Sequence, residues 1–146
     1  MTALALNRLT ETAATSSVVK DTLPLVGRVF LATIFVFSGL GKIAAAEPTI
    51  GYIAASGLPF PVLAYAGAVA VEVGLGLALI VGFQTRIAAL VLAGFSLVTA
   101  VVFHSAFGDQ NQLIHFLKNI GLAGGLLQVA SLGAGGFSID AKQRRI

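Results

Sequence analysis

Cysteine and tryptophan are absent from the 146-residue sequence, and charged side chains make up only 10% of it. Without cysteine, the chain can form no disulfide, thiolate nucleophile or cysteine-ligated metal site. An ordinary soluble domain is about 25% charged, because a fold of this size leaves much of its surface in water. The scarcity of charge therefore argues against a soluble domain.

The charges that are present do not predict a nucleic-acid partner. Nine basic and six acidic residues give a formal net charge of +3. A nucleic-acid-binding surface needs basic residues clustered on one face or along one helix. Here they are scattered between apolar runs, a distribution typical of the flanks of membrane helices.

Four long apolar segments account for most of the 57% hydrophobic content. Roughly 20 apolar residues in a helix match a hydrocarbon core about 30 Å thick. The segments predict transmembrane helices at about 23–43, 62–82, 87–107 and 111–132. The lipid bilayer is thus the first predicted partner of the chain.

The connections between these segments contain residues typical of turns. Residues 42–61 are rich in proline and glycine and predict an irregular loop, whereas residues 84–86 and 109–112 predict tight turns. Short connections place consecutive helices antiparallel. We therefore expect an all-α polytopic membrane protein, with a four-helix antiparallel bundle over residues 23–140.

The distribution of lysine and arginine predicts the orientation of the bundle. The tails, residues 1–22 and 141–146, and the turn at Arg86 carry most of the basic residues, whereas the opposite side has only Lys42 and the nearby Lys118. Cytoplasmic loops of membrane proteins carry the excess of lysine and arginine. Both termini are expected in the cytoplasm of a bacterial inner-membrane protein, with residues 1–22 as a disordered or surface-lying tail.

Small residues recur at helical spacing and predict where helices approach closely. The longest stripe is Ala66, Ala70, Gly74 and Ala78; shorter pairs are Ala89 with Ala93 and Gly121 with Gly125. Packing inside the bundle is the favoured explanation of these stripes. Contact with a second copy, giving a homo-oligomer, is the alternative.

Glu72 is the most informative single residue, because it is the only formal charge in the second apolar segment and lies near its midpoint. A carboxylate at this depth is costly unless it is protonated, hydrated or paired. Lys118, about 6 Å nearer the outer face by helical rise, is the first predicted partner, and Arg28 is the second. The pair could be structural, or Glu72 could carry a proton or bind a ligand.

Further polar residues fall in the same outer half of the predicted bundle: Ser38, His104 and Asn119. Together with Glu72, Lys118 and Arg28 they form a candidate intramembrane polar site. His104, Asp109 and His115 lack the spacing of a zinc site, so no metal is predicted. No nucleotide-binding or serine-hydrolase motif is present, and no catalytic residue or cofactor is identified from the residues alone.

Several short motifs resemble those of the DoxX family of small four-helix bacterial membrane proteins. They cover residues 23–140 in the same order: Gly27-Arg28, Phe37-Ser38-Gly39-Leu40-Gly41-Lys42, Gly57-Leu58-Pro59, Glu72, Gly82-Phe83-Gln84-Thr85-Arg86 with Ala88-Ala89, Lys118-Asn119, Gly124-Gly125-Leu126-Leu127 and Ser138-Ile139-Asp140. Each motif is short, and the combination of order and spacing carries the resemblance.

The resemblance implies a membrane subunit tied to redox chemistry. The related DoxD proteins are linked to thiosulfate:quinone oxidoreductase, and some mycobacterial relatives to a membrane-associated oxidoreductase complex. The chain has no cysteine and no soluble cofactor domain, so we expect an accessory subunit that interacts with quinone and docks on a redox enzyme, rather than a catalyst on its own. A small transporter or channel and a purely structural assembly protein are the alternatives.

Overall fold

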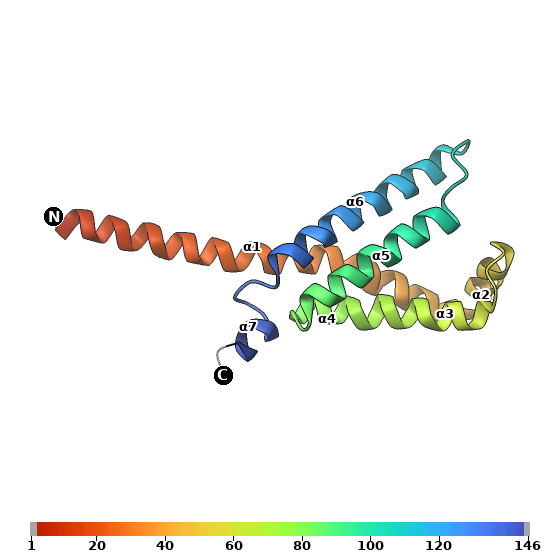
Figure 1. Cartoon of the computed structure of the whole chain (residues 1–146), viewed down its shortest axis with the longest axis horizontal. Coiled ribbons are helices and arrows are strands. Elements are labelled where there is room, and N and C mark those ends of the chain that lie inside the picture. The colour runs from red at the N-terminus through yellow and green to blue at the C-terminus, as the bar shows by residue number, and fades with distance from the viewer. Residues whose placement is uncertain (1–2, 145–146) are drawn as a thin grey trace.

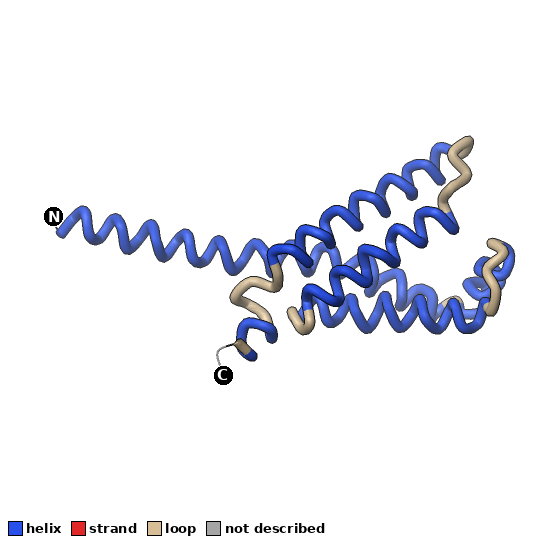
Figure 2. Tube along the Cα trace, viewed as in Figure 1, coloured by secondary structure: helices blue, strands red, loops and turns tan. Residues whose placement is uncertain are grey.

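The computed structural model describes the backbone of residues 3–144 and the side chains of residues 19–144, and every regular element in this part of the chain is a helix. Figure 2 shows these helices joined by short loops. In chain order they are α1 (Ala3–Ala44), α2 (Ala46–Ala55), α3 (Pro61–Val69), the π-helix η1 (Ala70–Leu75), α4 (Gly76–Val81), α5 (Thr85–Phe103), α6 (Gln110–Leu132) and α7 (Ile139–Gln143).

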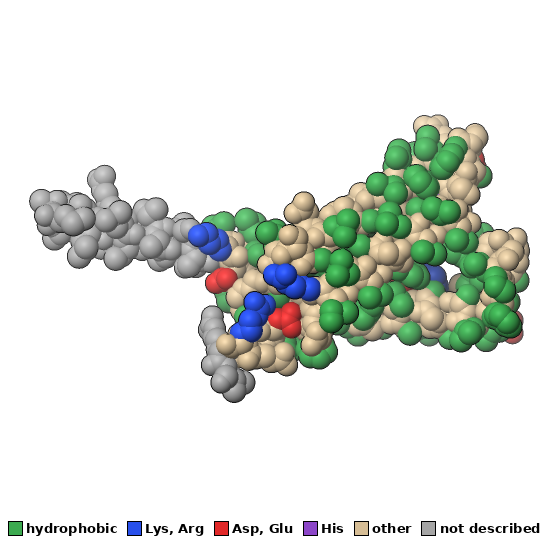
Figure 3. Space-filling model, in the orientation of Figure 1, with side chains coloured by type: hydrophobic (Ala, Val, Ile, Leu, Met, Phe, Trp, Pro, Cys, Tyr) green, Lys and Arg blue, Asp and Glu red, His purple; other side chains and the backbone are tan. Residues whose placement is uncertain are grey.

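The four predicted membrane helices are confirmed. Four helical segments are long and apolar enough to cross a bilayer: Val19–Ala44, Pro61–Val81, Thr85–Phe103 and Gln110–Leu132. The second segment joins α3, η1 and α4 into one continuous span. Figure 3 shows apolar side chains along the sides of the helices and basic ones gathered near α7, as expected of a molecule surrounded by lipid.

The helices form a wedge. α1 lies beside the α3–η1–α4 segment, and the α5–α6 hairpin diverges from them toward the end that carries α2 (Figure 1). We call this open end the α2 end, and the opposite end, which carries the α4–α5 turn and the C-terminal residues, the α7 end. The core fills the narrow part of the wedge with Ala32, Phe35, Leu79, Ala89, Leu92, Ala93, Ala123, Leu126 and Ala130. The core thus lies toward the α7 end and leaves the α2 end less filled.

Two glycines bring α1 close to its neighbour. A Cβ added at Gly39 would lie 2.6 Å from Val73 Cγ2, and one added at Gly76 would lie 2.8 Å from Val36 Cγ2. Each glycine thus accepts a valine from the opposing helix. This close approach brings the last turns of α1 against η1, where Glu72 lies.

The prediction for the longest small-residue stripe was wrong. Ala66, Ala70 and Gly74 are exposed, and a Cβ added at Gly74 would meet nothing within 4 Å. The stripe therefore faces away from the bundle, and packing inside the chain does not explain it. Contact with a second copy stays a prediction. The pair Ala89 and Ala93 is buried in the core as expected, and Gly125 packs against Leu31 whereas Gly121 has open space.

We predict opposite outcomes for two matched glycine substitutions. Gly39→Leu should lower stability by about 3 kcal/mol or more, because the new side chain would overlap Val73 and push α1 from η1. Gly74→Leu, in open space on the neighbouring segment, should be nearly silent. Thermal unfolding in mild detergent measures both, and equal losses would contradict this account of the interface.

Three features of the helices differ from the sequence-based expectation. The 42–61 connection contains α2, although an irregular loop was predicted; Pro48 falls in the first turn of α2, where a missing N–H is tolerated. α1 begins at Ala3, so residues 3–22 of the expected tail are helical. α5 ends at Phe103, before the predicted position 107.

Candidate functional site

Glu72 is positioned by a local widening of its helix. It lies in η1, one turn of π-helix between α3 and α4, and is only 4% exposed. Single π-turns within α-helices occur frequently at functional sites. Ala64, Ala68 and Glu72 follow at four-residue intervals and line the same cavity, described below.

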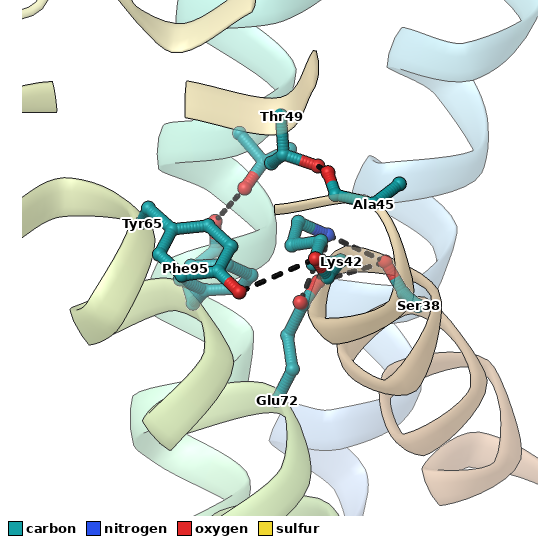
Figure 4. A network of polar contacts seen from close by, with 8 residues as sticks. Ser38, Lys42, Ala45, Thr49, Tyr65, Glu72 and Phe95 are labelled. Carbon is teal, nitrogen blue, oxygen red and sulfur yellow. Dashed lines mark hydrogen bonds and ion pairs between the residues drawn. The ribbon is translucent and has the colours of Figure 1, made fainter. Parts of the chain in front are cut away.

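The partner of Glu72 is Lys42, in the last turn of α1. Lys42 Nζ lies 2.9 Å from Oε1 and 2.8 Å from Oε2 of Glu72, so the ammonium sits against both carboxylate oxygens. Lys42 also donates to Ser38 Oγ (2.7 Å), and Ser38 Oγ donates to Glu72 Oε1 (3.0 Å). Figure 4 shows the three side chains converging from α1 and η1. We call Ser38, Lys42 and Glu72 the polar triad.

The predicted pairing of Glu72 with Lys118 was wrong. Lys118 is exposed on α6, whereas its neighbour Asn119 lines the cavity. Successive residues of an α-helix point about 100° apart, so the rotation of α6 that directs Asn119 to the cavity leaves Lys118 on a different face. Depth alone suggested Lys118, but the rotation of α6 turns it away from Glu72.

The polar triad borders a cavity of about 450 Å³ at the α2 end of the wedge. A cavity of this size matches the range of small-molecule sites, which are mostly apolar with a few placed polar groups. Apolar side chains from α1, α2, α3, α5, α6 and the following loops form most of its wall: Ile34, Phe35, Tyr52, Ile53, Leu58, Ala64, Ala68, Phe95, Val98, Phe103 and Leu122. The side chain of Lys42 is 26% exposed and therefore accessible from this space.

A second group of polar side chains lines the cavity from α5 and α6. The His104 and His115 rings stack with centroids 5.0 Å apart, and the Asn119 amide donates to the His115 carbonyl oxygen. His104 Nδ1 lies 2.9 Å from Gln112 Oε1. With this oxygen as acceptor, Nδ1 carries a proton, and in the neutral imidazole Nε2 is then the acceptor. Of the predicted site residues, Glu72, Ser38, His104 and Asn119 thus border one cavity.

α2 covers the open end of this cavity. Ile53, a residue of α2, is buried. The ring of Tyr52, also on α2, stacks on the ring of Phe103 of α5, with the two ring centroids 5.5 Å apart. Thr49 faces the cavity and bonds back to the Ala45 carbonyl, as Figure 4 shows. α2 therefore packs against α3 and α1 and reaches α5 through the Tyr52–Phe103 contact.

Arg28, the second predicted partner of Glu72, belongs to the α7 end instead. It is fully buried and donates to the carbonyl oxygens of Leu79 (3.2 Å), Phe137 (2.6 Å) and Pro24 (3.3 Å). These carbonyls come from α4, the C-terminal segment and α1 itself. Arg28 thus ties three segments together, a structural role that its sequence position did not reveal.

Asp140 completes the attachment of the C-terminal segment. Its two carboxylate oxygens accept the backbone N–H groups of Gln84 (2.8 Å) and Thr85 (2.9 Å), and so cap the start of α5. Partial burial raises the pKa of Asp140, but these hydrogen bonds and the Arg144 charge outweigh it and hold the pKa below its ordinary value. The stabilisation is therefore present above the ordinary pKa and is lost as pH falls through the lowered one.

Sequence reasoning missed four residues in or beside the site. Lys42 was noted only as a basic residue of the outer side and within a family motif, and the signal that could have identified it is its spacing of one helical turn from Ser38. Tyr52 was missed because residues 42–61 were predicted to form an irregular loop, and Phe103 because it is one of many apolar residues in the 87–107 span. Tyr65, whose hydroxyl donates to the Lys42 carbonyl oxygen (3.3 Å), was also missed; it braces the end of α1.

Comparisons with known proteins agree with this architecture. The sequence pattern of the DoxX family matches residues 23–105. The chain is 40% identical to the Escherichia coli (strain K12) inner membrane protein YqjF over 116 residues, 80% of this chain and 88% of that protein. It is 34% identical to the inner membrane protein YphA of the same organism over 128 residues, covering 84% and 91% of the two chains. No solved structure matches it. The family match over more than half of the chain, the two relatives and the four apolar spans together show that this membrane protein belongs to the DoxX family.

Proposed function

We propose that this protein binds a small quinone-type molecule in the cavity at the α2 end and serves an oxidoreductase system as a membrane subunit. The observation that carries the proposal is the lining of the cavity: an apolar and aromatic wall with polar groups from two directions. The proposed role is binding, with the electrons supplied by a partner enzyme.

The chemistry of the lining suits a quinone ring. Such a ring is flat and apolar, with an oxygen at either end. Lys42 is a charged donor for a carbonyl oxygen on the α1 side, and the Nε2 of neutral His104 is an acceptor for the hydroxyl of the quinol form on the α5–α6 side. Phe95 and Phe103 supply aromatic surface for the ring between them.

We further propose that the protein lies in the inner membrane, in line with the names of the two relatives. We also propose that its α7 end faces the cytoplasm. Arg86 at the start of α5, Lys142 in α7 and Arg144 just after it lie at this end, and cytoplasmic loops carry the excess of basic residues. The cavity would then open in the outer half of the bilayer. A reporter fused after Ile146 should be active only in the cytoplasm, and periplasmic activity would reverse the orientation.

A path for a solute through the bundle has less support. Below the cavity, Leu79, Leu92 and Leu126 are fully buried and fill the narrow part of the wedge. A space closed by packed side chains at one end is typical of a binding site. A purely structural role is the remaining alternative, and the binding experiment below distinguishes it.

The test is direct binding of the ubiquinone head group to the full-length protein in nanodiscs. The double variant Lys42→Met/Glu72→Gln should bind at least about tenfold more weakly, because hydrogen bonds to charged groups contribute about 1.5–3 kcal/mol. Thr33→Val is the control on α1, since Thr33 is exposed and bonds only to its own helix. Equal binding by a folded double variant and wild type, or no binding to wild type, would overturn the proposal.

A pull-down tests the partner. Protein purified in mild detergent should bring down a redox enzyme with bound quinone, and loss of the quinone alone in the double variant would separate ligand binding from docking. Purification without any redox partner would favour a structural role.

A further inference from the structure

The cavity also has lining residues that are exposed on the sides of the bundle, where lipid would lie. Two of its lining residues, Ile34 of α1 and Val98 of α5, are 47% and 61% exposed. The cavity is lined from α1, α3, α5 and α6. Because the α5–α6 hairpin diverges from the other two helices (Figure 1), we distinguish a side of the cavity between α1 and α6 from another between α3 and α5. Both sides lie within spans that are apolar enough to be surrounded by lipid.

The two sides differ in chemistry. On the α1–α6 side the lining includes His115 and Asn119, which offer polar groups. On the α3–α5 side it comprises Ala64 and Ala68 of α3 and Phe95, Val98, Thr99 and Phe103 of α5, and the Thr99 hydroxyl is already bonded to the Phe95 carbonyl oxygen. We use the name α3–α5 gap for the part of this side that Ala64, Ala68 and Val98 border, which is apolar. The alanines are four residues apart on one face of α3, and their small side chains occupy little space there.

Access from the water at the α2 end is covered by α2. The Tyr52 ring stacks on Phe103, and Ile53 is buried below. At the opposite end the core closes the wedge, where Gly125 packs against Leu31. Of the three ways into the cavity, through the α2 end, through the α7 end or between the helices, the route between the helices is therefore the most apolar.

We infer that the ligand of this cavity is a lipid with a long apolar chain, which enters from the bilayer and keeps its chain in the α3–α5 gap while its polar head lies at the polar triad. This inference rests on the proposed function for the nature of the head group, but the gap itself does not depend on it. An apolar chain gains nothing from the polar α1–α6 side and loses no hydrogen bond in the α3–α5 gap.

The first test compares two quinones that share a head group. Ala68→Leu should weaken the binding of decylubiquinone by about tenfold, the loss expected when about two methylene groups lose their burial. Binding of the tail-less head group should weaken much less, because the head lies at the polar triad. Ala66→Leu is the matched control, because Ala66 lies on the same helix but is exposed and outside the cavity. An equal loss for both quinones, or no loss for either, would overturn the inference.

The second test needs no quinone. The chain has no tryptophan, so Phe95→Trp creates a single reporter inside the cavity. In nanodiscs with acyl-brominated lipids its fluorescence should be quenched, and adding Ala68→Leu should relieve most of that quenching. Leu97→Trp, at an exposed α5 position, should be quenched with or without Ala68→Leu.

The outcomes separate the two proposals. If the reporter at position 95 is quenched and Ala68→Leu relieves the quenching, lipid chains enter through the α3–α5 gap. This conclusion would hold even if the quinone head group did not bind and the proposed function were wrong. An unquenched reporter at position 95, beside a quenched one at 97, would show that lipid chains do not reach the cavity and would overturn the gap.

Discussion

Replacing Lys42 with methionine is expected to destabilise the protein by about 3 kcal/mol, because it leaves a buried carboxylate without its counter-charge. Glu72 is almost fully buried, and both of its oxygens lie within 3.0 Å of Lys42 Nζ. Ser38 supplies one remaining hydrogen bond. Thermal or denaturant unfolding in detergent measures the loss.

The double-mutant cycle gives the sharper result. Lys42→Met combined with Glu72→Gln should recover at least about half of the loss, since removing both members of a buried pair is tolerated better than removing one. Lys118→Met is the matched control: the same substitution at an exposed lysine should change stability by less than about 0.5 kcal/mol. Additive effects of the two substitutions at Lys42 and Glu72 would show that they are not coupled.

The membrane spans and the importance of Glu72 could be predicted because both follow from composition along the chain. A run of apolar residues fixes a span, and a carboxylate within it needs a partner whatever the fold. The identity of that partner depends on how each helix is rotated about its axis. Lys118 and Asn119 differ by one position, and only Asn119 borders the cavity.

The small-residue stripes show the same limit. Spacing identified both the Ala89–Ala93 pair and the Ala66–Gly74 stripe, yet the first is buried and the second exposed. The π-turn at η1 changes the register between α3 and α4, and no simple pattern in the sequence announces it. Gly39 and Gly76, which bring α1 close to η1 and α4, follow no such repeat.

The short helix α2 was missed for a different reason. Proline and glycine in residues 42–61 are typical of loops, but Pro48 falls where a helix tolerates it and Gly57 lies beyond the helix end with φ +80°. Since α2 forms the cover of the cavity, the cavity itself could not be predicted. Some of the polar residues on its walls, namely Ser38, Glu72, His104 and Asn119, could be predicted, because polar side chains are rare in these spans.

Arg28 is the residue whose loss should affect the α7 end most. Its guanidinium is fully buried and donates to carbonyl oxygens of α1, α4 and the C-terminal segment. Gly82, at φ +70°, lies so close that an added Cβ would overlap Arg28 Nη1 and the Ser138 side chain. The guanidinium therefore occupies a space shaped for it, and no other side chain can donate in three directions from one plane.

Arg28→Met should lower the free energy of unfolding by about 4 kcal/mol, because it keeps the alkyl packing but leaves the Leu79 and Phe137 carbonyls without their donor, at about 1–3 kcal/mol for each buried group. Hydrogen exchange should rise over residues 137–143, since Phe137 would no longer be held. Arg28→Lys should fall between methionine and wild type, as a single ammonium reaches fewer carbonyls. Arg86→Met, at an exposed arginine of the same end, should leave both measurements near wild type. If Arg28→Met lowered stability without raising exchange over 137–143, Arg28 would support the helices but not hold the C-terminal segment.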